Sequence, residues 1–468
     1  MGGGLLQLAS TGEQDVYLTG TPQITMWKLI YKRHTNFSME SIEQSFNSDL
    51  DFGKKIVCNV SRSGDLIHKV WLRLKLGDIV TKENQGTNSY RWARNIVCLI
   101  IKSLEVEIGG QVIDKHYGEW FDIYWKLMVP YSKSNVEVEN DFMNLTTSNL
   151  PNIINKISQN YYIQNPGLGK KDYTPIANND NVFVSKGGVF YIPLNFWFCR
   201  NPGLALPVIA LQHHEVKFNL ELRNIEELVV NNSNTIKKFD GIFPEPKNGY
   251  EKPTISGNFW IDYIFIDTEE RRKFALSNHE YLIEQLQYNE GKSIDRDTNY
   301  CSAELNFKHP IKELFWTITP SEYCSYPKTD NFFMYSNEFG NFESHLESAK
   351  ITFNGHDRIK ERDEQYFRWV QPYQHHTKIT GLHINSYSFA LKPEEHQPTG
   401  TCNFSRIDNA YLHVNLNSGH QTQEEYSGSN SEIKNLSYTE GSFVLKVFAW
   451  NYNILRISSG MGGLLYSN

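Results

Sequence analysis

The sequence predicts an all-β protein in which one sandwich-like unit occurs twice in tandem. Many short stretches place apolar residues at every second position, and the alternate side chains of a strand point to opposite faces of its sheet. Four segments of the first half also recur, in order, in the second half at offsets of 241 to 246 residues. A chain of 468 residues is long enough for two such units.

The composition agrees with this fold class and narrows the function. Apolar residues make up 40% of the chain, and its 26 Tyr and 27 Phe favour strands over helices. The formal net charge of −7 argues against a protein whose main task is to neutralise nucleic-acid phosphates. We therefore expect no direct nucleic-acid partner.

The repeat is clearest in a predicted β-hairpin. The stretch "SLEVEIGGQVIDK" (103–115) aligns with "SAKITFNGHDRIK" (348–360) at an offset of 245 residues. Gly-Gly in the first stretch and Asn-Gly in the second fall where the alternation breaks, and both pairs supply the positive φ of a type I′ turn. We therefore predict the same hairpin in both halves.

Three further matches keep nearly the same offset. "DLIHKVWLRL", from residue 65, aligns with "HPIKELFWTI", from residue 309, and "SIEQ" (41–44) aligns with "LIEQ" (282–285). Trp120-Phe121 aligns with Tyr366-Phe367. Each match alone is weak because β-rich sequences share alternating patterns, but their order indicates two copies of one fold unit.

The two copies differ by an insertion. The strand "VKFNLELR" (216–223) corresponds to "YLHVNLN" (411–417) at an offset of only 195, so the first copy carries about 50 extra residues before it. Residues 131–186, rich in Asn, Ser, Lys and Gly, are that insertion; a partner contact and a tolerated loop without a role both remain open. Units of this kind are typical of two-sheet jelly rolls. The expected division is an arm at 1–24, a first unit at 25–223 and a second unit at 224–468.

No motif completes a catalytic or metal-binding pattern. "HEYLI" (279–283) begins like a zinc-protease motif, but Ile283 stands where the second His ligand is required. The six cysteines include no C-x-x-C pair. His213-His214 and His375-His376 are sequence neighbours, which would point to opposite faces of a strand. We predict structural or solvent-facing histidines, no cofactor, no metal site and no enzymatic activity.

The stretch "YSFALKPEEHQPTGTCNFSRID" (387–408) resembles an active site only at first sight. Its turn-forming Pro and Gly residues predict an ordered corner between two strands. Consecutive acidic residues diverge, whereas acid–base catalysis needs two carboxylates that face one substrate. The predicted corner contains six residues of catalytic type: Glu394, Glu395, His396, Cys402, Ser405 and Asp408.

Targeting and modification signals are sparse. We find no secretory signal peptide and no apolar run of membrane-spanning length, and we expect the cysteines to be buried thiols made in a reducing compartment. If any N-x-[ST] sequon carries a glycan, Asn144 in the insertion is the best placed. The six sequons begin at Asn36, Asn59, Asn144, Asn231, Asn403 and Asn435.

Five blocks of the sequence resemble the major capsid proteins of nucleocytoplasmic large DNA viruses. The block that contains "STGEQDVYLTGTPQITMWK" and the block "SFALKPEEHQPTGTCNFSRID" are long enough to be specific. The segments 131–186 and 418–440 carry no resemblance. The five blocks span residues 5–38, 195–223, 261–275, 387–408 and 451–468.

The resemblance implies two consecutive eight-stranded jelly rolls and a structural role. Three chains would form a homotrimer whose six lobes fill a hexagonal position of an icosahedral shell, assembled in the host cytoplasm and located in the virion. Neighbouring capsomers and minor capsid and penton proteins would be its partners. The amino-terminal arm would lie toward the inner face, where the inner viral membrane is a candidate partner.

Two alternatives stay open on the residues alone. A carbohydrate-binding or glycosidase-like β-sandwich could share this architecture, because a fold does not determine a function. It would need a carboxylate pair or an aromatic platform in a cleft. A minor capsid or spike protein of the same fold is the other alternative, and it would be sparse in particles.

Overall fold

The structure is a computed structural model, and it describes residues 3–82, 90–93, 95–130, 182–185, 187–231, 252–295, 298–321, 332–333, 335, 344–379, 383–417 and 442–466. The chain divides into two compact units, Met1–Phe37 and Ser38–Asn468. The first unit includes the predicted arm, and the regular structure of its described residues before Phe37 consists of short helical segments without a buried residue. These segments are α1 (Gly3–Ala9), η1 (Glu13–Asp15) and α2 (Val16–Thr19).

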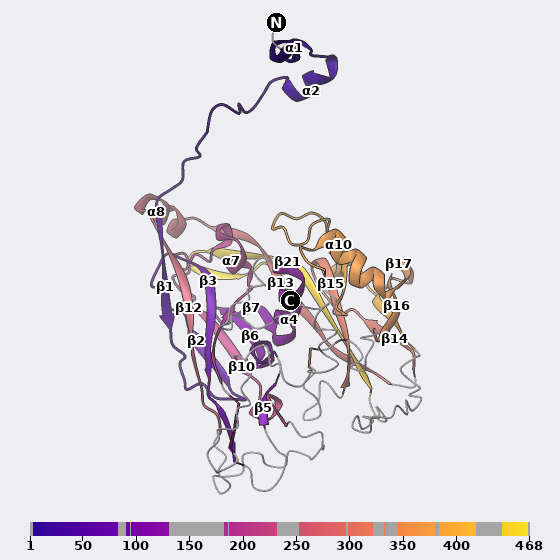
Figure 1. Ribbon diagram of the computed structural model, residues 1–468. Helices are drawn as coiled ribbons and strands as arrows, with labels where there is room; N and C mark the ends of the chain where they lie inside the picture. The colour runs from indigo at the N-terminus through magenta and orange to yellow at the C-terminus, as the bar shows by residue number, and fades with distance from the viewer. Residues whose placement is uncertain are drawn as a thin grey trace. The chain divides into compact units, whose positions relative to one another are not determined.

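The larger unit begins with a pair of four-stranded antiparallel sheets (Figure 1). One sheet has the strand order β1-β12-β3-β9, and the other has the order β2-β10-β6-β7. We call this pair the first roll. Its strands are β1 (Phe37–Gln44), β2 (Lys55–Asn59), β3 (Leu66–Leu76), β6 (Ile101–Ile108), β7 (Gln111–Tyr117), β9 (Val189–Pro193), β10 (Val216–Leu222) and β12 (Ile255–Ile266).

A second pair of sheets repeats this arrangement and forms the second roll. Its sheets have the orders β13-β21-β15-β18 and β14-β20-β16-β17, and β19 and β22 extend the first of them. The strands are β13 (His279–Ile294), β14 (Tyr300–Glu304), β15 (Pro310–Pro320), β16 (Leu346–Phe353), β17 (His356–Asp363), β18 (Asn385–Ser388), β19 (Cys402–Asn403), β20 (Ala410–Leu416), β21 (Phe443–Ser458) and β22 (Met461–Leu464).

The two strand orders match position by position, so the predicted tandem repeat is confirmed as two eight-stranded jelly rolls. In each roll the last long strand along the chain lies between the two strands that begin the same sheet. β12 lies between β1 and β3 in the first roll, and β21 lies between β13 and β15 in the second. β12 pairs with β3 from Ile255 opposite Leu76 to Ile264 opposite Leu66. A division at residue 223 would therefore cut β12 off from the sheet that it completes.

Both predicted hairpins are present. β6 and β7 are joined by Gly109 and Gly110, and β16 and β17 are joined by Asn354 and Gly355. All four residues have positive φ, between 49° and 86°, as a type I′ turn requires. The sequence signal was reliable here because a two-residue turn is a local property.

Each roll encloses its own apolar core between its two sheets. The first core includes Leu72, Leu104 and Phe218, which come from both sheets of the first roll, and the second includes Trp316 and Leu412. Side chains alternate between this inner face and the outer face along each strand, as the pattern of "WLRLKL" predicts. The two cores account for the apolar periodicity of both halves.

Short helices connect the strands and lie between the rolls. α8 is capped by Asp267, whose side chain accepts a hydrogen bond from the Glu270 N–H at 3.0 Å, and it links β12 to β13. α4 lies between the two rolls, and α10 lies beside β17 at the far edge of the second roll (Figure 1). The helices used below are α4 (Gly118–Met128), α7 (Trp197–Arg200), α8 (Thr268–Leu276), the π-helical η5 (Tyr366–Val370) and α10 (Gln371–His375).

Some predictions lie outside the described residues. Residues 131–181 and 186 of the insertion belong there, as do Asn144 and Cys324. Of the described cysteines, Cys58, Cys98, Cys199 and Cys301 are buried free thiols, and Cys402 is a partly buried free thiol. In the described part of the chain, no helix is long and apolar enough to cross a membrane.

Candidate functional site: buried polar contacts between the rolls

The His213-His214 pair fastens the carboxyl-terminal hairpin of the second roll to the first roll. The His213 N–H donates a hydrogen bond to the Gly460 carbonyl at 2.9 Å, and His214 Nδ1 lies 2.9 Å from the Gly462 carbonyl oxygen. Both residues lie in the bend before β10 and not in a strand, so strand alternation does not apply to them. The predicted structural role is confirmed, for a different geometric reason.

Residues 387–408, which we call the corner, connect β18 to β20 as predicted. Glu394 turns toward His376 and Thr377, whereas Glu395 pairs with the exposed Lys392 at 2.8 Å. Ser405 accepts a hydrogen bond from the His309 N–H through its hydroxyl oxygen. Glu394, Glu395 and Ser405 thus have separate structural partners and do not converge.

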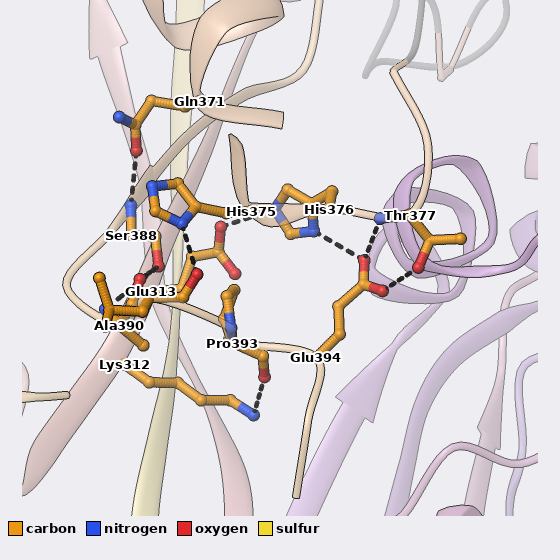
Figure 2. A network of polar contacts seen from close by, with 11 residues as sticks. Lys312, Glu313, Gln371, His375, His376, Thr377, Ser388, Ala390, Pro393 and Glu394 are labelled. Carbon is orange, nitrogen blue, oxygen red and sulfur yellow. Dashed lines mark hydrogen bonds and ion pairs between the residues drawn. The ribbon is translucent and has the colours of Figure 1, made fainter. Parts of the chain in front are cut away.

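His376 lies between two carboxylates, as Figure 2 shows. Its Nε2 is 2.6 Å from Glu313 Oε1, and its Nδ1 is 3.0 Å from Glu394 Oε1. Burial alone lowers the pKa of His376, but the two carboxylates outweigh burial and raise it to about 9. An imidazolium that donates from both nitrogens has no lone pair left for a metal ion or for proton abstraction.

Helix α10 is held against the corner by two hydrogen-bonding contacts (Figure 2). Gln371 accepts a hydrogen bond from the Ser388 N–H at 3.0 Å, and His375 Nδ1 lies 3.0 Å from the Leu391 carbonyl oxygen. His375 and His376 therefore have different partners, and the pair forms no common site. Both histidines have structural partners, which is one of the two outcomes predicted for them.

A buried ionic cluster joins the corner to both rolls. Lys312 of β15 is fully buried, and its Nζ donates to Glu284 of β13 and, at 2.7 Å, to the Pro393 carbonyl. The same Nζ lies 3.3 Å from the centroid of the Trp450 ring. Arg200 of α7, from the first roll, also pairs with Glu284 and lies 4.7 Å from the centroid of that ring.

The electrostatics of this cluster follow from burial and pairing. Burial lowers the pKa of Lys312 to about 8, although Glu284 opposes the shift. Burial disfavours the charged form of Glu284, yet Arg200 and Lys312 together hold its pKa below the usual value. The glutamate is therefore ionised at neutral pH and shared by two cations, one from each roll.

Helix α4 carries a second set of buried polar contacts. Glu119 accepts hydrogen bonds from Thr317 at 2.8 Å and from Lys446 at 2.7 Å, both in the second roll. Asp122 pairs with Lys126 one turn away and accepts a hydrogen bond from Tyr335. Trp120 lies between Glu119 and Asp122 on the same helix. Its ring centroid is 5.3 Å from that of Phe315 and 5.9 Å from that of Trp450.

Our sequence reasoning did not find Lys312, Glu284 or Arg200. A usable signal was present, because Lys312 and Glu313 interrupt the otherwise mostly apolar strand "PIKELFWTITP", where a charge must find a partner. The partners themselves are 28 and 112 residues away from Lys312 along the chain. Only the fold identifies them.

The pocket found among the described residues does not offer the carboxylate pair that a glycosidase needs. A pocket beside α8 is lined by Phe274, His279, Tyr281 and one carboxylate, that of Glu280. Hydrolysis of a glycosidic bond normally uses two carboxylates on opposite sides of the sugar. Among the described residues, no group of three His, Cys, Asp or Glu side chains is arranged to hold a metal ion.

The raised pKa of His376 leads to a pH-dependent contribution to stability. The folded state binds this proton more tightly than the unfolded chain, so the contribution is fully present below about pH 6.5 and is lost as the pH rises through about 9. The shift corresponds to up to about 3 kcal/mol. We expect His376→Gln to destabilise the protein at about pH 6 and progressively less toward pH 9, measured by urea unfolding.

Lys312 serves as an internal control for this pH prediction. Because burial lowers its pKa, Lys312 raises the free energy of unfolding as the pH rises above about 8. The lysine is present in both the parent and the variant. The difference between the two proteins therefore isolates His376. A difference that is independent of pH would show that His376 is not charged in the folded state.

Comparisons with known proteins agree with this fold. Residues 25–267 match the family model described as "Major capsid protein N-terminus", and residues 270–463 match "Large eukaryotic DNA virus major capsid protein". The boundary between the two matched regions falls directly after β12. The chain is 40% identical to the major capsid protein of Pyramimonas orientalis virus and 38% identical to that of Paramecium bursaria Chlorella virus 1, over the full length of each pair.

Solved structures show the same likeness. The chain superimposes on the structure titled "PBCV-1 virus capsid, quasi-atomic model" with a TM-score of 0.66 and 33% identity, over 95% of this chain and all of that one. A Faustovirus major capsid protein gives a TM-score of 0.62 at 12% identity, over 96% of this chain and 94% of that one, which supports the fold alone.

Two jelly rolls of one topology, joined by buried contacts, define a double jelly-roll protein. The chain belongs to the family of large eukaryotic DNA virus major capsid proteins. Its role is structural, and its place is in the capsid of the virion.

Proposed function

We propose that the chain acts as a closed homotrimer whose six jelly rolls fill a pseudo-hexagonal position of an icosahedral shell. The observation that carries this proposal is the identical strand order of the two rolls within one chain. Two similar lobes per chain let three chains present six similar sides, so that one trimer can meet six neighbours in the same way. The buried contacts at α4, Glu284 and Lys312 support the proposal because they hold the two lobes in one fixed arrangement.

We also infer that the chain has no catalytic activity and no cofactor. In the described part of the chain, buried histidine and acidic side chains are engaged with partners of the protein itself. His376 has carboxylate partners on both ring nitrogens, and Glu284 has two cationic partners. Groups paired in this way stabilise the protein but are not available to a substrate.

Contacts beyond the trimer form a further part of the proposal. Minor capsid and penton proteins would bind the assembled capsomers, and assembly would take place in the host cytoplasm. The arm would meet the inner viral membrane. This is supported by segment 27–33, which follows the arm in the same compact unit and combines exposed Trp27 and Leu29 with three cationic residues, a composition that binds anionic lipid surfaces.

The native mass of the purified chain tests the proposed trimer. We expect a particle of three times the chain mass of 54.3 kDa, and we expect it to persist on dilution. Light scattering or native mass spectrometry measures this mass directly. A stable, correctly folded monomer at all concentrations would contradict the proposal.

A further inference from the structure

A lysine and an aspartate of helix α4 are buried together between the rolls. Asp122 is fully buried, Lys126 is 4% exposed, and Lys126 Nζ lies 2.5 Å from Asp122 Oδ2. The two residues are four positions apart, so they lie on the same face of the helix. Lysine and aspartate side chains are rarely buried to this extent, because both charges lose their hydration.

The surroundings of this pair are apolar and supply one further polar group. Tyr335 belongs to the buried apolar cluster around α4. Its hydroxyl donates a hydrogen bond to Asp122 Oδ2 at 3.1 Å, and its ring centroid lies 5.4 Å from Lys126 Nζ. Burial and the neighbouring Asp122 carboxylate hold the pKa of Tyr335 well above its usual range, so the phenol remains a hydrogen-bond donor.

The Asp122 carboxyl group is poorly solvated for an ionised group. Its Oδ2 receives both contacts, whereas Oδ1 is buried and has no hydrogen-bond partner among the described residues. A buried carboxylate oxygen without a donor costs free energy. Burial raises the pKa of Asp122 above its ordinary value, and Lys126 and Tyr335 reduce this shift without cancelling it. The fold therefore favours the neutral acid more than water does.

We propose that Lys126 and Asp122 condense to an isopeptide bond after the chain has folded. The amine nitrogen lies against a carboxyl group that is held in apolar surroundings and polarised by a hydroxyl donor. The bond would close the side chains of α4 into a covalent bridge over one helical turn. This goes beyond the proposed capsid function, because it assigns a covalent modification to the helix that lies between the rolls.

The reaction is a dehydration that needs no further reactant, and no group in it is oxidised or reduced. Apolar surroundings favour the transfer of a proton from the ammonium to Oδ1, which gives a neutral amine and a neutral acid. The amine nitrogen bonds to Asp122 Cγ, and the Tyr335 hydroxyl stabilises the negative charge that develops on Oδ2. The bond from Cγ to Oδ1 then breaks. Oδ1 leaves as water with the acid proton and one proton from the nitrogen.

Bond formation removes each unfavourable feature of the buried pair. The amide carries no charge, so neither side chain remains a desolvated ion. The oxygen that leaves is Oδ1, which has no partner, whereas Oδ2 keeps the hydrogen bond from Tyr335. The folded chain also holds the amine and the carboxyl group in contact, which replaces the slow encounter of two separate molecules.

The mass of the intact chain tests this inference. We expect the full-length protein, denatured for mass spectrometry, to be lighter than its sequence mass by one water, about 18 Da. The matched control is Lys126→Arg, because it keeps a cation beside Asp122 but replaces the amine by a guanidinium that stays charged. We expect this variant, folded by circular dichroism, to have its full sequence mass. A parent chain at full sequence mass would overturn the proposal.

A tryptic digest of the parent locates the bond without any substitution. Trypsin cleaves after a lysine only when the amine is free, so we expect the chain to stay uncut after Lys126 and to be cut there in Lys126→Arg. Asp122 could also lose water by closing onto the next backbone nitrogen, and that product would persist in the variant. Cleavage after Lys126 in the parent, or the same loss of water in the variant, would contradict the assignment.

Tyr335→Phe tests how the fold promotes the reaction. This change removes the hydroxyl that contacts Oδ2 and keeps the ring in the apolar cluster. We expect the dehydrated fraction to form at least about tenfold more slowly after synthesis. An unchanged rate would overturn the role of the hydroxyl. The mass of the denatured chain does not depend on its association state, so failure of this inference would leave the proposed trimer standing.

Discussion

Replacing Trp120 with alanine is expected to lower the free energy of unfolding by about 3–5 kcal/mol. Trp120 is almost fully buried between the rolls, where it contacts Phe315, Phe448 and Trp450. Removing the indole leaves a cavity that the sheets on either side cannot close, because β15 and β21 are held by their own hydrogen-bonded pairing. The loss should therefore lie at the upper end for a single substitution.

The same substitution should also weaken the coupling between the rolls. Each roll keeps its own core, so we expect Trp120→Ala to broaden or split the urea-unfolding transition, whereas the parent unfolds more cooperatively. Trp120→Phe should give a smaller loss, and Leu276→Ala on the exposed face of α8 should change little. If Trp120→Ala and Leu276→Ala have equal effects, α4 does not join the rolls.

The second large effect is expected for Lys312→Met. This change removes one of the two cations that pair with Glu284 but keeps a side chain of similar length in the buried position. Glu284 is then left buried with Arg200 alone, and the Pro393 carbonyl loses its donor. Breaking a buried ion pair on one side typically costs about 3–5 kcal/mol, because the remaining charge stays desolvated.

An exposed ion pair provides the comparison for Lys312. Lys102 pairs with Glu221 at 2.7 Å, with more than half of the lysine side chain accessible to solvent. Lys102→Met should therefore cost about 1 kcal/mol or less. Urea unfolding of both variants measures the contrast, and equal losses would mean that the Glu284 cluster does not stabilise the fold.

The local features of the fold could be predicted because they depend on neighbouring residues. The two hairpins follow from Gly-Gly and Asn-Gly at the turn, and the sheets follow from alternating apolar residues. The corner at 387–408 follows from its Pro and Gly residues. Because these local signals occur in the same order in both halves, they also predict the tandem repeat.

Features that depend on distant pairing could not be predicted in the same way. β12 lies beyond the predicted end of the first unit, and its place in the first sheet is set by hydrogen bonds to β3, about 190 residues earlier in the chain. Sequence alternation identified this strand but carried no information about its partner. A division at residue 223 follows the order of strands along the chain and not their pairing in the sheet.

The sequence alone determined the all-β class, the tandem repeat and the family resemblance, since each depends on residue types in local order. The tertiary structure decided which buried charges meet. It places Arg200, Glu284 and Lys312 around one ring and His376 between Glu313 and Glu394. These contacts form only when both rolls fold, because the energy of a buried charge depends on partners that are distant in sequence.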